Sequence, residues 1–172
     1  GESAFYGCTS LESVALPEGV TDLESYVFAD CTSLKTVDLG ESVTSIGYGS
    51  FRNCKVLAGI ELSETLTSIG TEAFYKTGLT ELTIPDSVTK LNQKSFAECS
   101  KLKRVTIGDG LTSIPDSAFY FCSNLESLTL GSNVTIIGPS AFYYADIRHL
   151  RIPDSVKTID ANAFYCCDML TS

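Results

Sequence analysis

Residues 28–51 read FADCTSLKTVDLGESVTSIGYGSF, one unit that runs from a phenylalanine to the next phenylalanine. The same residue returns along the whole chain at intervals of 22 or 23 positions: Phe5, Phe28, Phe51, Phe74, Phe96, Phe119, Phe142 and Phe164. A unit this short cannot bury its own apolar face, so its copies must stack on one another. The period therefore predicts a solenoid, which offers a long regular surface rather than one deep pocket.

Five further apolar positions recur in every unit. In the quoted unit they are Leu34, Val37, Leu39, Val43 and Ile46. The alternation around Asp38 predicts a short strand with one buried face, and residues 43–46 predict a second extended segment. A Ser or Asp before several of the phenylalanines, followed by Ala-Phe-x-x-Cys, predicts a short helical turn. We expect residues 1–172 to form one α/β-type, right-handed solenoid of about seven 22–23-residue coils, mostly short parallel strands with short helical turns.

The order Leu-x-x-Val-x-Leu-Pro, Val-x-x-Ile, Ala-Phe-x-x-Cys resembles the leucine-rich repeats of BspA-like bacterial surface proteins. The resemblance covers essentially all 172 residues. It implies a leucine-rich-repeat solenoid, secreted or held at the cell surface, that binds host or neighbouring-cell proteins, such as extracellular-matrix or cell-surface proteins. Both ends of the chain fall inside a repeat, so we expect a fragment of a longer array whose signal and anchor lie outside it. Open repeat ends would also offer a route to end-to-end self-association.

The composition excludes some classes of partner. The net charge is −9, with 21 acidic against 12 basic residues, which disfavours a large nucleic-acid interface because phosphates require clustered Lys and Arg. No run approaches 18 apolar residues, so no transmembrane helix and no direct membrane insertion are expected.

Motifs that carry catalysis are missing from the sequence, and we predict no enzyme, no catalytic residue, no cofactor and no metal site. His149 is the single histidine, and it falls at an outward strand position. Six of the seven cysteines lie three residues after a phenylalanine, where Thr77 and Ala145 replace them in the two shorter units. Exchange with Thr and Ala favours a buried core column over disulfides or zinc, although those alternatives stay open. Cys166 lies two residues after Phe164, and we expect either a reactive thiol or intermolecular bridge, or a partly covered cysteine.

Charged residues gather on the predicted outward side of the longer strands. Asp38, Glu61 and Glu81 form an acidic middle, and Lys103, Arg104, Arg148, His149 and Arg151 form a basic C-terminal part. We predict a protein-binding face with a charge-sorted register, since such complementarity sets orientation and association rate. The alternative is that these are solvated strand residues without a partner.

A second candidate surface is aromatic and lies on the side of the turns. Its residues directly follow their phenylalanines: Tyr120, Phe121, Tyr143, Tyr144 and Tyr165. Such a cluster is typical of an interface or a carbohydrate platform, unless it only covers the phenylalanine column. The sequence thus predicts first a non-enzymatic adhesion or recognition module at the cell surface or secreted. The alternatives are a structural spacer or stalk for another domain, and a carbohydrate-binding platform.

Overall fold

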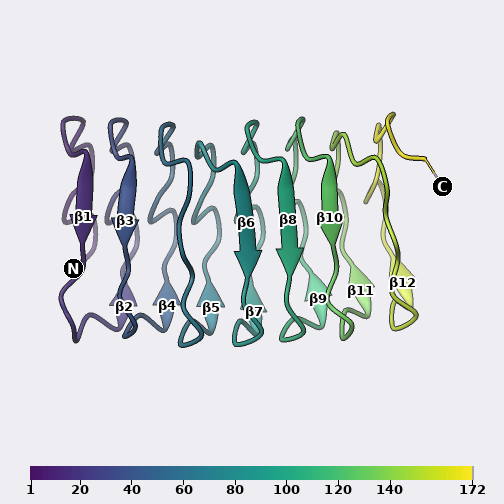
Figure 1. Cartoon of the computed structure of the whole chain (residues 1–172), viewed down its shortest axis with the longest axis horizontal. Coiled ribbons are helices and arrows are strands. Elements are labelled where there is room, and N and C mark those ends of the chain that lie inside the picture. Colours follow the sequence, from purple (N-terminus) through teal and green to yellow (C-terminus); the bar gives the residue numbers. More distant parts are fainter. Residues whose placement is uncertain (172) are drawn as a thin grey trace.

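The computed structural model describes residues 1–171 and shows a solenoid whose coils stack along one long axis (Figure 1). Two walls of parallel strands run along it. The longer strands form the first wall: β1 (Ser13–Ala15), β3 (Thr36–Asp38), β6 (Glu81–Ile84), β8 (Arg104–Ile107) and β10 (Ser127–Thr129). The second wall holds two-residue strands: β2 (Asp22–Leu23), β4 (Ser45–Ile46), β5 (Ser68–Ile69), β7 (Lys90–Leu91), β9 (Ser113–Ile114), β11 (Ile136–Ile137) and β12 (Thr158–Ile159).

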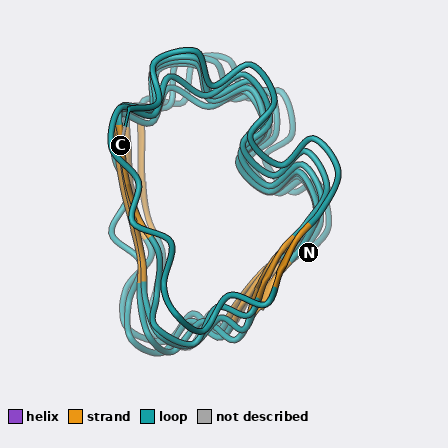
Figure 2. Ribbon diagram, turned by 90° about the vertical axis from the view of Figure 1, so that its right-hand side faces the viewer, coloured by secondary structure: helices purple, strands orange, loops and turns teal. Residues whose placement is uncertain are grey.

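Each strand pairs in parallel with its copy one repeat away. Val14 lies opposite Val37 in β1 and β3, and Leu82 lies opposite Val105 in β6 and β8. The end-on view in Figure 2 shows the coils superimposed, with the two strand walls joined by loops. This register confirms the predicted strands where they form, with every inward side chain above its copy in the next coil. The first strand was also expected at residues 60–62 and 150–152, and those two stretches are not strands.

The predicted helical turns are wrong: residues 1–171 contain turns around each phenylalanine but no helix. In each of these turns, the residues two before and two after the phenylalanine have positive φ, as at Tyr26 (57°) and Asp30 (60°) around Phe28. Alternate backbone N–H groups there reach the neighbouring coil, as Phe28 N donates to Ser50 O at 2.8 Å, and the others reach the third residue back, as Ala29 N donates to Tyr26 O. Left-handed residues four positions apart cannot belong to an α-helix, so the repeat is all-β.

The number of coils also differs from the prediction. The structure makes about six turns rather than seven, because the seven strands of the second wall enclose six full turns between them. The chain before β2 and after β12 forms incomplete turns.

Phenylalanine rings form a continuous column through the core. Consecutive rings stack with centroids 5.0–5.5 Å apart, from Phe5 to Phe164. The six rings between those two ends are fully buried, whereas Phe5 remains 43% exposed. Stacked aromatic pairs add stabilisation beyond the area they bury, so this column links each coil energetically to the next.

The cysteine column lies beside the phenylalanine column. Cys31, Cys54, Cys99 and Cys122 are buried, as predicted for a core position, whereas Cys8 is exposed and Cys167 is half-buried. Each buried thiol also donates a hydrogen bond that the sequence did not predict. Cys54 Sγ lies 3.1 Å from the carbonyl oxygen of Phe28, in the preceding coil, and the other three repeat this contact.

Both walls are interrupted, at different coils. In the first wall β1–β3 and β6–β8–β10 are separate sheets, and the stretch between β3 and β6 is not a strand. In the second wall the break falls between β7 and β9. We call the first interruption the Phe51 coil, after the phenylalanine that begins it, and take it as residues 51–73.

Candidate functional site

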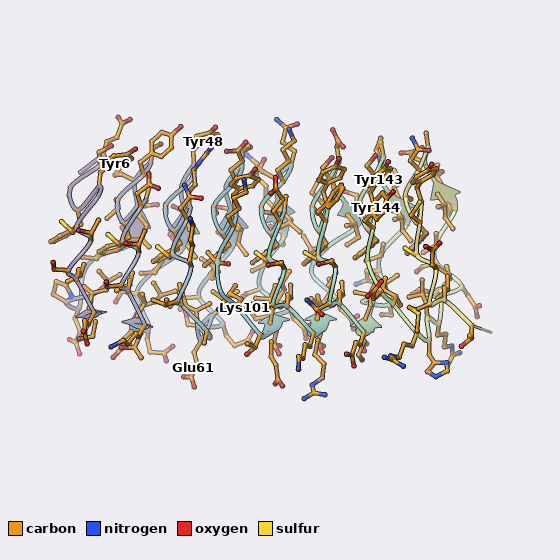
Figure 3. All side chains as sticks on the ribbon, turned by 90° about the horizontal axis from the view of Figure 1, so that it is seen from above. Tyr6, Tyr48, Glu61, Lys101, Tyr143 and Tyr144 are labelled. Carbon is orange, nitrogen blue, oxygen red and sulfur yellow. The ribbon has the colours of Figure 1, made fainter. Side chains whose placement is uncertain are left out.

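The outward side of the first wall, called here the strand face, carries the charged residues predicted for binding. Asp38, Glu61, Glu81, Lys103, Arg104, Arg148, His149 and Arg151 are all exposed. Glu61 projects from one side of the solenoid, opposite Tyr6, Tyr48, Tyr143 and Tyr144 (Figure 3). The two surfaces predicted from the sequence therefore lie on opposite sides of the molecule.

The three predicted acidic residues meet in one hollow. Asp38, Glu61 and Glu81 line a groove of about 970 Å³ that crosses the strand face at the Phe51 coil, together with Glu41 and Glu64. None of the described residues that line it is Lys or Arg. We call this hollow the acidic groove.

Small residues explain why the strand face is hollow at this coil. Gly59 occupies the position that is Thr36 in the coil before and Glu81 in the coil after, and Ala58 precedes it. A Cβ added to Gly59 would meet no atom within 4 Å. Glycine and alanine are poor strand formers, which fits the absence of a first-wall strand at residues 59–62.

Basic residues of the strand face form two groups rather than one. Arg104 on β8 makes an ion pair with Glu81 on β6, with Nη2 and Oε1 2.7 Å apart, and so marks the border with the acidic groove. Lys103 precedes Arg104, whereas Arg148, His149 and Arg151 lie beyond β10. The sequence did not show that Arg104 is paired and that, within residues 1–171, the C-terminal cations are not, because a list of charges does not show which cation lies opposite an anion.

The C-terminal basic group borders a smaller hollow of about 430 Å³. Arg151, Asp154 and the rim of β10 line it. His149 forms single bridges with Ser127 and with Thr171, whose hydroxyl lies 3.3 Å from His149 Nδ1. His149 therefore lies among strand-face contacts, and no acid–base partner is placed beside it within residues 1–171.

The aromatic patch predicted from the sequence assembles on the turn side. Tyr143 stacks on Tyr120 and on Tyr165, with ring centroids 5.1 and 4.8 Å away, and Tyr144 stacks on Phe121 at 4.8 Å. Phe121, Tyr144 and Tyr165 are 39%, 41% and 49% exposed. The patch therefore does more than cover the phenylalanine column.

The surroundings of two tyrosines in this patch raise the pKa values of their hydroxyl groups. The pKa of Tyr144 is raised, chiefly by a hydrogen bond with the Cys166 side chain, and burial raises the pKa of Tyr143. Cys166 is half-buried, which fits the partly covered cysteine of the two readings above.

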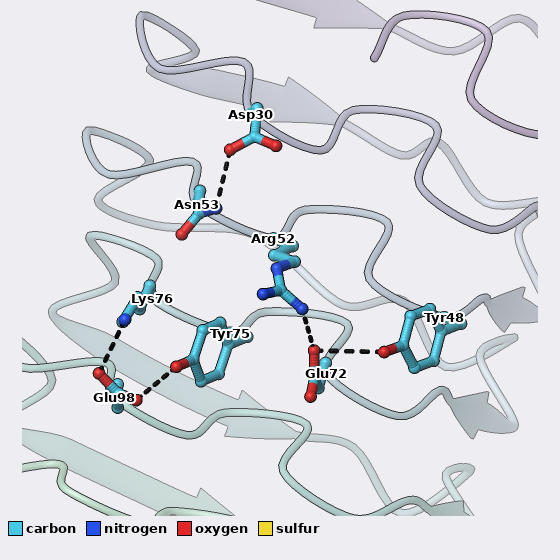
Figure 4. Close-up of polar contacts among 8 residues, drawn as sticks. All are labelled: Asp30, Tyr48, Arg52, Asn53, Glu72, Tyr75, Lys76 and Glu98. Atoms are coloured by element: carbon cyan, nitrogen blue, oxygen red, sulfur yellow. Dashed lines mark hydrogen bonds and ion pairs between the residues drawn. The ribbon is translucent and has the colours of Figure 1, made fainter. Parts of the chain in front are cut away.

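Towards the N-terminus the same turn side is polar (Figure 4). Glu72 accepts from Arg52 and, at 3.4 Å, from the Tyr48 hydroxyl. In the next coil Glu98 accepts from the Tyr75 hydroxyl and pairs with Lys76 at 3.2 Å. The arginine and lysine also lie over the Tyr75 ring, 4.9 and 5.0 Å from its centroid. Because these charged side chains already pair with one another, this region has fewer groups free to bind a partner than the aromatic patch has.

Residues 1–171 hold no group of three His, Cys, Asp or Glu side chains placed to bind a metal ion. No helix in that range is long and apolar enough to cross a membrane.

Comparison with known proteins agrees with the repeat and the coil geometry. A family model for the BspA type leucine rich repeat region matches in six copies, over residues 1–103 and 56–171. The chain belongs to this family. A search of curated proteins gave no match.

Solved leucine-rich-repeat proteins share the fold. The T. pallidum leucine rich repeat protein is 31% identical over 83% of this chain and 67% of its own, with a TM-score of 0.78. A leucine-rich repeat protein from Bacteroides ovatus is 26% identical over 99% of this chain, with a TM-score of 0.73. This chain spans 56% of the length of that protein. A leucine rich cell surface protein from Faecalibacterium prausnitzii is 25% identical over 98% of this chain and 61% of its own, with a TM-score of 0.50.

Proposed function

We propose that this protein is a non-enzymatic interaction module, at the cell surface or secreted, that binds a protein ligand through its strand face. The observation that carries the proposal is the ordered division of charge on that face, from the acidic groove to the Arg148–Arg151 group. Membership of the BspA-type family and the cell-surface name of the Faecalibacterium prausnitzii neighbour support the location.

The strand face suits a protein partner better than a small substrate. Its charged residues are exposed and spread over several coils, and its hollows are open along the surface rather than enclosed. Exposed charges of both signs steer a partner and fix its register more than they add affinity. A host extracellular-matrix or cell-surface protein is the class of ligand we favour.

The test is a binding screen of the chain against extracellular-matrix proteins and intact host-type cells. The informative variant is Arg148→Glu with Arg151→Glu, because these two cations make no ion pair within residues 1–171, whereas Arg104 is held by Glu81. Lys101→Glu with Lys55→Glu is the matched control, since both are exposed lysines outside the charged columns. Saturable binding that only the first variant loses supports the strand face. No binding to any target would favour a spacer that carries another domain.

One observation favours a second candidate, a carbohydrate platform. Phe121, Tyr144 and Tyr165 expose their rings beside one another on the turn side, and exposed aromatic clusters mark ligand surfaces. A glycan array of the chain and of the Tyr144→Ala, Tyr165→Ala variant tests it. Glycan binding that disappears in the variant would establish the platform, and an array without signal would end it.

A further inference from the structure

We propose that the acidic groove binds an extended peptide segment in which lysine or arginine alternates with apolar residues. This inference rests on the proposed function, because it names the partner chemistry of one part of the strand face. Three features of the groove carry it: its apolar floor, its acidic rim and the missing side chain in its centre.

The floor of the groove is apolar and partly open. Val37, Ile60 and Leu62 line it and are half-buried, whereas Leu82 and Val105, at the same positions as Val37 and Ile60 in later coils, are buried. Covering half-buried aliphatic side chains with another apolar group removes apolar surface from water and is favourable in free energy. The floor is therefore able to accept every second side chain of an extended chain, which points to one side of its backbone.

The rim of the groove is acidic. Asp38, Glu41, Glu61, Glu64 and Glu81 line it, and only Glu81 is paired with a cation, Arg104, among residues 1–171. Carboxylates so close together repel each other, and a partner with several positive side chains relieves that repulsion while forming charge-assisted hydrogen bonds. The rim disfavours an acidic peptide, a nucleic acid and an anionic membrane for the same reason.

The shape of the groove suits an extended chain that lies across its outward side. Residues 58–62 of the Phe51 coil pass between β3 and β6, and Ala58 O accepts from Thr80 N at 2.9 Å, so the edges of both strands face this coil rather than solvent. A ligand therefore meets the groove with its side chains. An extended segment places alternate side chains over the apolar floor and the others beside the acidic rim.

The probe for the test is a fluorescein-labelled 10-residue peptide that alternates lysine with valine, measured by fluorescence anisotropy with the whole chain. A peptide that alternates glutamate with valine serves as the reversed-charge probe. We expect saturable binding of the lysine peptide alone, weakening as salt is raised. Glu61→Gln removes the central carboxylate and is expected to raise the Kd by about tenfold. Glu126→Gln is its control, since Glu126 is exposed on the same face outside the groove.

A second variant blocks the groove without changing its charge. Gly59→Thr places a threonine in the centre of the groove, as Thr36 stands at the same repeat position one coil earlier. The open space around Gly59 leaves room for this side chain, so we expect the variant to fold, and a thermal melt verifies it. Loss of lysine-peptide binding in Gly59→Thr and Glu61→Gln, with Glu126→Gln unchanged, supports the groove. Equal binding by all variants, or an equal loss in Glu126→Gln, overturns it. The cell and matrix screen with the Arg148, Arg151 variant is read separately, so the wider function can stand or fall on its own.

Discussion

At the scale of single residues, the buried thiols act as hydrogen-bond donors as well as small apolar groups. Each lies where a hydroxyl or methyl group also occurs in the repeat, at Thr77 and Ala145, and both of those are buried too. The thiol fills the same space and also satisfies a carbonyl group of the coil before. Because burial disfavours the thiolate, the pKa of Cys54 is raised to about 12 and that of Cys99 to about 11.

This shift predicts a loss of stability in strong base. The folded protein holds the Cys54 proton more tightly than the unfolded chain, whose thiol ionises near pH 9, so the contribution is complete below pH 9 and is lost as the pH rises towards 12. The slope for this one thiol is on the order of 1 kcal/mol per pH unit. Urea titrations from pH 8 to 11 measure it, and Cys54→Ala, which copies Ala145, is expected to have a shallower slope. Identical slopes would show that the thiol is not buried in solution.

At the scale of the element, the turn around each phenylalanine is held by hydrogen bonds to the next coil as well as by its own, such as Ala97 N to Lys94 O. Lys94 shows this: it has a φ of 55°, its side chain is exposed, and its N–H donates to Asp116 O at 3.1 Å in the next coil. A positive φ strains every residue except glycine. The strained conformation persists because hydrogen bonds between neighbouring coils hold each turn in the same backbone conformation.

The effects of two lysine-to-glycine substitutions on stability distinguish this turn from a helix. Lys94→Gly relieves the positive φ, so we expect no loss of stability and a gain of up to about 1 kcal/mol. Lys90→Gly, four residues earlier and equally exposed but in β7, is expected to cost about 1 kcal/mol. Urea denaturation of both variants compares them. If the segment were helical, Lys94→Gly would also cost about 1 kcal/mol.

The elements also show what a single sequence can and cannot predict. The strands and core columns could be predicted, because the alternation around Val37 follows directly from burial of one face. The turns could not, since Ser or Asp before Ala-Phe fits a helix start equally well, and the deciding hydrogen bonds go to another coil. The outward position of Glu61 was predictable, whereas the groove was not: Gly59 becomes a hollow only when the coils beside it are in place.

At the scale of the whole molecule, the staggered interruptions of the two walls leave the phenylalanine column and the turns as the continuous connections. The first wall breaks at the Phe51 coil and the second breaks between β7 and β9, and Phe74 lies between these two breaks in the chain. Stability in a repeat array is close to a sum of coil and neighbour terms, so a defect is most damaging where other connections are already missing.

This arrangement predicts unequal effects of two identical substitutions. Phe74→Ala removes a fully buried ring and is expected to cost roughly 3–5 kcal/mol. Because the walls already break on either side of it, its urea transition should split into two steps as the two ends of the solenoid unfold separately. Phe5→Ala removes a ring that is 43% exposed and stacked on one side only, so it should cost far less and keep one transition. Equal losses, or a single sharp transition for Phe74→Ala, would mean that the coils are coupled through the walls despite the breaks.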